Sequence, residues 1–61
     1  MPVIFLKSGG CAIVGGYTVK EGVFKVVDVE FRDTGLPADK AKQPEAVIPT
    51  DNVLYIIPGR L

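Results

Sequence analysis

The stretch that decides the fold is IPTDNVLYIIP, residues 48–58, close to the end of the chain. Pro49 ends a short apolar run, Thr-Asp-Asn supplies a turn, and Val53–Ile57 then carries an apolar side chain at every position until Pro58 and Gly59 stop it. Such a run between turn residues is typical of a β-strand buried on both faces. A small chain has little to cover the outer face, so either the core encloses this strand or another molecule covers it.

Upstream of this stretch the sequence predicts four more short strands. Val3–Leu6 is an apolar run that ends in a Gly-rich turn, and residues 11–19 form a second run that two glycines interrupt, which indicates one bent strand. Val23–Arg32 alternates between apolar and charged side chains toward its end, as a strand with one wet face does. Residues 46–48 complete the set as a short strand that a proline stops.

The remaining segment, residues 33–44, reads DTGLPADKAKQP and keeps neither a strand nor a helix period, so it is expected to be a surface loop. Five short strands with tight turns and no place for a long helix predict a single all-β domain over residues 1–61, folded as a small, strongly bent five-stranded barrel. The side chains expected in its core or in an interface are Ile4, Leu6, Ile13, Val27, Val29, Phe31, Val47, Val53 and Ile56.

Composition restricts the chemistry of the chain. Of 61 residues, 48% are hydrophobic and 23% charged, which is typical of a folded globular domain rather than of a disordered or membrane-spanning one. The absence of His excludes a Ser-His-Asp triad and His-ligated metal sites. The formal net charge is zero, so any contact with nucleic acid must be local. We expect no enzymatic activity, catalytic residues, metal or cofactor.

The single cysteine, Cys11, has no partner for an internal disulfide, as is typical of a protein from a reducing compartment. The first residues, MPVIFLKSGG, lack the charged segment and long apolar run of a secretory signal. These two features predict a cytoplasmic protein that is not associated with a membrane.

The order of elements and two local strings resemble the Sm-like family, which includes the Sm and Lsm proteins and bacterial Hfq. Residues 52–56, Asn-Val-Leu-Tyr-Ile, match the family's second motif in place, and Gly10, Gly15 and Glu21 match its first motif more loosely. The resemblance covers nearly the whole chain. It implies a barrel of the Sm-like, SH3-like type, here without the N-terminal helix found on most members.

The resemblance also implies a homo-oligomeric ring. In family members, the strand that corresponds to the one before Pro49 here pairs with the last strand of a neighbour. Rings of five to seven subunits are open to this chain, and such pairing would cover the strand edge that the monomer leaves bare. The residues expected at the interface are Val47, Ile48, Val53, Leu54, Tyr55 and Ile56.

Function follows from the same resemblance, which implies binding of short single-stranded RNA, U- or A-rich, at a central pore lined by Glu21, Val23, Lys25, Thr50 and Asp51. The chain departs from the family here: Lys25 replaces an Asn, and Pro49-Thr50 replaces an Arg-Gly pair. These departures favour the alternative, a structural or protein-interaction ring, or an unrelated SH3-like barrel, without RNA binding.

Individual candidates also have plainer explanations. Lys25 is either a pore cation or a solvated lysine on the wet face of a strand. Thr50 and Asp51 either contact bases or belong, with Asn52, to ordinary turn chemistry, which the residue types favour slightly. Phe24 lies next to the expected binding turn and is the aromatic side chain expected to stack on a base.

Overall fold

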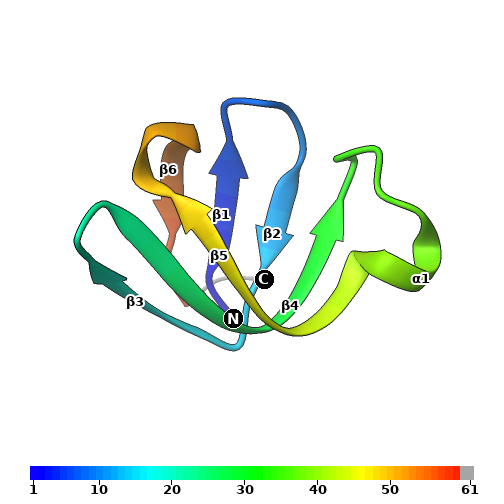
Figure 1. Ribbon diagram of the computed structural model, residues 1–61, viewed down its shortest axis with the longest axis horizontal. Helices are drawn as coiled ribbons and strands as arrows, with labels where there is room; N and C mark the ends of the chain where they lie inside the picture. Colours follow the sequence, from blue (N-terminus) through cyan, green and yellow to red (C-terminus); the bar gives the residue numbers. More distant parts are fainter. Residues whose placement is uncertain (60–61) are drawn as a thin grey trace.

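The structure is a computed structural model and describes residues 1–59 of the chain. It is all-β apart from two single-turn helices, as the sequence predicted (Figure 1). The elements in chain order are β1 (Val3–Leu6), β2 (Cys11–Ile13), β3 (Gly16–Lys20), β4 (Val23–Arg32), α1 (Ala38–Ala41), β5 (Lys42–Pro49), the 3₁₀ turn η1 (Thr50–Asn52) and β6 (Val53–Ile57).

All the strands belong to one strongly curled antiparallel sheet. The order β3-β4-β2-β1-β6 runs across it, and β5 pairs with the other side of β4. The pairs Cys11↔Arg32 and Gly16↔Val27 lie in the same register, so β2 and β3 are two halves of one bent strand, as the paired glycines predicted. Among residues 1–59, β5 and β6 do not pair with each other. The sheet is therefore an open half-barrel.

The sheet bends sharply in the middle of β4. Asp28 has a left-handed φ of 52°, and opposite it the N–H of Gly15 donates to the carbonyl oxygens of both Val27, at 2.8 Å, and Asp28, at 3.2 Å. A Cβ on Gly15 would lie 3.0 Å from the Cβ of Asp28, which is tighter than ordinary contacts. The bend therefore depends on a glycine opposite a residue type that tolerates positive φ.

The core lies on the concave side of the sheet, and partly buried side chains of Phe31, Ala46, Val53 and Ile56 pack against it. Its buried members are Ile4, Leu6, Ala12, Val14, Phe24, Val26, Val29 and Ile48. Of the expected core, Ile4, Leu6, Ile13 and Val29 are buried.

Two side chains expected in the core or an interface lie on the convex side. Val27 is 47% exposed and Val47 is 60% exposed, so neither belongs to the core. The bend at Asp28 shifts the alternation by one residue, so that Val26 and Val29 point inward and Val27 does not. A share of Val27 and Val47 in an interface stays a prediction.

The prediction of a loop over residues 33–44 was wrong at its second half. Ala38–Ala41 forms a single helical turn, and β5 begins at Lys42. The long strand β4 supplies backbone hydrogen-bond partners for the start of β5, with Glu30 opposite Lys42. These bonds override the weak preference of the local sequence for a loop. Pro44 is tolerated because its register position lies opposite the bend at Asp28, where the ladder is interrupted.

Candidate nucleic-acid interface

Three connections meet at one end of the half-barrel: the β1–β2 turn, the β3–β4 turn and η1. The N–H of Thr50 donates to the carbonyl oxygen of Gly22 over 2.9 Å, which joins η1 to the β3–β4 turn. The N–H of Lys7 donates to the carbonyl oxygen of Asn52 over 2.7 Å, which joins η1 to the β1–β2 turn. We call this region, residues 7–10, 20–23 and 50–52, the loop end.

The β3–β4 turn projects a carboxylate at the loop end. Lys20 and Val23 pair across a two-residue turn in which Glu21 has φ 51° and Gly22 has φ 81°. Positive φ at both central positions is the type I′ geometry that suits the twist of a hairpin. The side chain of Glu21 is thereby held outside the sheet and exposed to solvent.

Asn52 is a structural clamp. Its side-chain Oδ1 accepts a hydrogen bond from the N–H of Ser8 over 2.9 Å, and its Nδ2 donates to the Oγ of Ser8 over 3.1 Å. Both ends of the amide are therefore occupied within the protein, between turns 44 residues apart in the chain. This arrangement supports the turn-chemistry interpretation of Asn52.

Replacement of Asn52 by Ala should remove both hydrogen bonds to Ser8. We expect the free energy of unfolding to fall by about 1–3 kcal/mol, since each bond is worth about 0.5–1.5 kcal/mol, with exposed bonds at the lower end. Urea unfolding followed by circular dichroism measures this free energy. The control is Asp51→Ala, because the side chain of Asp51 makes no hydrogen bond within residues 1–59. Equal stability of the two variants would contradict the clamp.

Four of the five residues predicted to bind RNA lie at the loop end or beside it. Glu21, Val23, Thr50 and Asp51 belong to it, and Val23 pairs with Pro49 at the end of β5. Lys25 lies two residues farther along β4, exposed on the convex face. The structure thus brings four of these residues together and places the cation to one side.

Two cations at the loop end were missed by sequence analysis. Lys7 follows β1 directly, and Lys20 is the last residue of β3, next to Glu21. Both are exposed. The two lysines balance the charges of Glu21 and Asp51, so the formal net charge of the loop end is zero. The signal that could have identified them is their position as turn-flanking residues.

Phe24 cannot present a free ring to a base because it is only 8% exposed and belongs to the core. This corrects the prediction from sequence. The ring of Tyr17 lies 5.8 Å from that of Phe24, centroid to centroid, and Tyr17 is 38% exposed. Tyr17 is therefore the accessible aromatic side chain next to Phe24.

The β5 strand has an unpaired edge. The N–H of Thr50 donates to the carbonyl oxygen of Gly22, and the same register continues along β5. Residues at even-numbered positions of β5 therefore direct their backbone N–H and C=O groups toward β4. Ala46 and Ile48 follow the same alternation. The N–H of Val47, between them, therefore points to the free edge, and its side chain is exposed as well.

The β6 strand has a second unpaired edge. The N–H of Val14 donates to the carbonyl oxygen of Pro2 over 3.0 Å, in the register of the β1–β2 pair. Residues at even-numbered positions of β1 therefore direct their backbone N–H and C=O groups toward β2. Odd-numbered Phe5 therefore bonds to its partner Tyr55 in β6. The backbone groups of Ile56, one residue on, point away from β1 to the free edge.

The residues predicted at the interface fall into two groups. Val47, Leu54 and Tyr55 are more than half exposed, whereas Ile48 is buried in the core. Val53 and Ile56 are half-buried and pack against the core, so substitutions there would perturb the fold as well as any interface.

Within residues 1–59 no three His, Cys, Asp or Glu side chains are grouped so that they could hold a metal ion. The helices in this part of the chain are too short to cross a membrane. Comparison with known protein families, with curated proteins and with solved structures finds no match to this chain.

Proposed function

We propose that this protein is an Sm-like, ring-forming module in which β5 of one copy pairs with β6 of the next. The observation that carries the proposal is the pair of unpaired strand edges on one curled sheet: β6 is apolar throughout, and β5 is apolar from Ala46 to Ile48. An exposed edge without charges, prolines or a covering loop is a template for strand addition. Of the β6 residues, none is charged, and Leu54, Tyr55 and Ile57 are exposed.

Pairing of two different edges is heterologous, and it closes into a ring when each step adds a suitable rotation. The strong curl of the sheet is the feature that supports such a rotation. Pro49 lies at the end of β5, and Pro44, at an even-numbered position, faces β4 and not the free edge. The N–H groups of Gln43, Glu45 and Val47 therefore remain open to a neighbour. We propose rings of five to seven copies.

The loop end is the proposed RNA site of this ring. Each copy would contribute Lys7 and Lys20, with Lys25 beside them, and repetition around a ring would multiply these local cations although the net charge of the chain is zero. Glu21 and Asp51 repel phosphate. We therefore propose weak binding of a short single strand that is directed mainly at its bases, with the lysines as its few phosphate contacts.

One observation favours the alternative, a structural or protein-binding ring without RNA. Asn52, the polar amide of the stretch that matches the second motif, is held by Ser8 through both its Oδ1 and its Nδ2, which leaves one N–H and one oxygen lone pair for a base edge. Thr50 is the other uncharged polar side chain of η1.

Fluorescence anisotropy with oligo-U and oligo-A distinguishes the two functions. We expect Lys20→Ala and Lys25→Ala each to weaken binding and to lower the slope of log K against log salt by about 1 for each lost phosphate contact. Lys40→Ala, in α1 away from the loop end, is the matched control and should leave both quantities unchanged. No binding below about 100 µM, the upper end of ordinary non-specific affinity, would favour the ring without RNA.

A further inference from the structure

A third free edge belongs to β3, the outermost strand on one side of the sheet (Figure 1). The N–H of Thr50 donates to the carbonyl oxygen of Gly22, so even-numbered positions at the start of β4 face β5 and odd-numbered positions face β3. The β3 residues that pair with these odd-numbered positions therefore bond to β4, and they are Gly16, Thr18 and Lys20. The backbone N–H and C=O groups of Tyr17 and Val19, between them, point to the free edge and have no partner within residues 1–59.

On the concave side this edge is apolar. Tyr17 lies opposite Val26 and Val19 lies opposite Phe24, so both side chains continue the rows of the core beyond β4. Val19 is nevertheless 53% exposed, because no further strand covers it. A strand added beside β3 would cover Tyr17 and Val19 with its own side chains at every second position, and apolar side chains suit these places.

On the convex side the same edge is cationic. Lys25 lies opposite Thr18, and Lys20 is the next β3 residue on this side. These residues line a hollow of about 440 Å³ together with Gly16, Tyr17 and Val27. No carboxylate lines this hollow, and neither lysine forms an ion pair within residues 1–59. An added strand would therefore meet two uncompensated cations on this side, and acidic side chains suit it.

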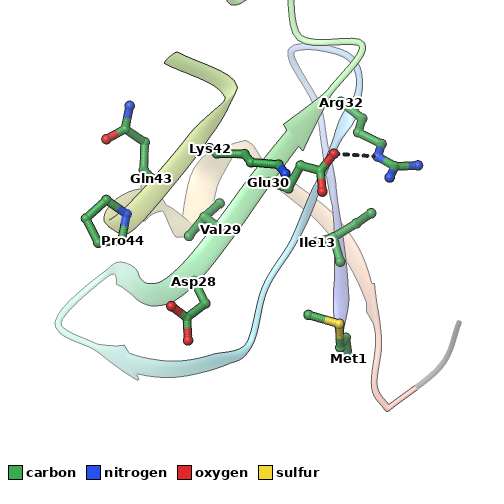
Figure 2. Close-up of a pocket in the computed structure, with 9 residues that line it drawn as sticks. All are labelled: Met1, Ile13, Asp28, Val29, Glu30, Arg32, Lys42, Gln43 and Pro44. Carbon is green, nitrogen blue, oxygen red and sulfur yellow. Dashed lines mark hydrogen bonds and ion pairs between the residues drawn. The ribbon is translucent and has the colours of Figure 1, made fainter. Parts of the chain in front are cut away.

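A hollow at the bend of β4 and beyond shows the contrast (Figure 2). Two acidic and two basic side chains line it: Asp28, Glu30, Arg32 and Lys42. The Nε of Arg32 lies 3.3 Å from the carboxylate of Glu30. The charges of that hollow are balanced within the subunit, whereas those beside β3 are not.

We propose that the free edge of β3 binds an extended peptide segment in which apolar and acidic residues alternate, as an added antiparallel strand. The sheet is antiparallel throughout, and the added strand continues it. Its apolar residues lie opposite Tyr17 and Val19 and bond to their backbone groups. Its acidic residues lie on the convex side, opposite Thr18 and Lys20 and next to the row of Lys25. A second copy of β3 is disfavoured because it would bring its own lysines to this side.

The probe is a fluorescently labelled peptide in which four valines alternate with three glutamates and both ends are blocked. Wild-type protein is titrated into it up to about 1 mM, and fluorescence anisotropy measures the dissociation constant. We expect saturable binding, and at least about fivefold weaker binding when lysine replaces the glutamates, because the attraction across the strands becomes repulsion. N-methylation of two inner valines should abolish binding, since it removes donors that face β3. N-methylation of two glutamates, whose N–H groups face solvent, is the matched control and should leave the dissociation constant unchanged.

No binding up to about 1 mM would overturn the proposal. So would equal binding of the two N-methylated peptides, which would indicate attraction by charge alone and leave Lys20 and Lys25 to RNA. The reverse preference between them would overturn the antiparallel register. In the protein, Val19→Pro removes an N–H that faces the free edge and should abolish binding, whereas Val19→Thr keeps it and should not. The peptide series involves neither RNA nor the β5 and β6 edges, so this proposal and the proposed function fail independently.

Discussion

Replacing Val47 by proline should convert the proposed ring into folded monomers at about 10 µM protein. The N–H of Val47 points to the free edge of β5, where it would bond to β6 of the neighbour. Proline removes this donor and places its ring in the path of the incoming strand. The edge tolerates proline because no bond within the subunit is lost. Size-exclusion chromatography with light scattering gives the mass.

Two matched variants separate edge pairing from folding. Val47→Thr keeps the N–H and a β-branched side chain, so the ring should remain. Ala46→Pro removes an N–H that faces β4, where Ala46 pairs with Val26. That variant should be destabilised by about 3 kcal/mol or more. A folded Val47→Pro protein with the wild-type mass would contradict pairing through this edge.

Gly10→Ala should have the largest effect on stability of any Gly→Ala exchange in the chain. Gly10 has φ 77°, and a Cβ there would overlap the backbone carbonyl oxygens of Arg32 and Asp33. Backbone atoms cannot swing aside as a side chain can, so the end of β4 would have to move. We expect a loss of about 3 kcal/mol or more, from strain and overlap together. For a chain of 61 residues the whole stability is roughly 3–9 kcal/mol.

Gly9→Ala is the control for this effect, because Gly9 also has a positive φ, 109°, but nothing lies within 4 Å of its added Cβ. The difference between the two variants in urea unfolding isolates the overlap from the backbone strain. Equal losses of stability would show that the close approach of the β1–β2 turn to β4 is not required.

The strands with the strongest local patterns were predictable from the sequence. The bounds of β1, β4 and β6 agree with the predicted runs, because each run is apolar or alternating and ends at Gly, Pro or turn residues. The bend between β2 and β3 was predictable from Gly15 and Gly16. These features depend on residues close together in the chain, which a sequence pattern records directly.

The features that sequence analysis missed depend on contacts between distant residues. Lys42 and Gln43 join β5 only because β4 is long enough to pair with them, which their own composition does not reveal. The outward position of Val27 follows from the left-handed φ of Asp28, and strict alternation placed it on the same side as Val29. In each case tertiary structure overrode the local pattern.

The candidate site was predictable in part. The resemblance in the two motifs placed Glu21, Thr50 and Asp51 close to one another, and the bond between the two turns agrees with that placement. The engagement of Asn52 with Ser8 could not be predicted, since it joins two turns far apart in the sequence.

The measurement that tests edge pairing most directly is the mass of the wild-type protein at about 10 µM, by native mass spectrometry or sedimentation equilibrium. The account predicts one closed species that contains five to seven chains of 6.5 kDa each. A 6.5 kDa monomer at this concentration, or an open-ended series of masses without a closed species, would contradict it.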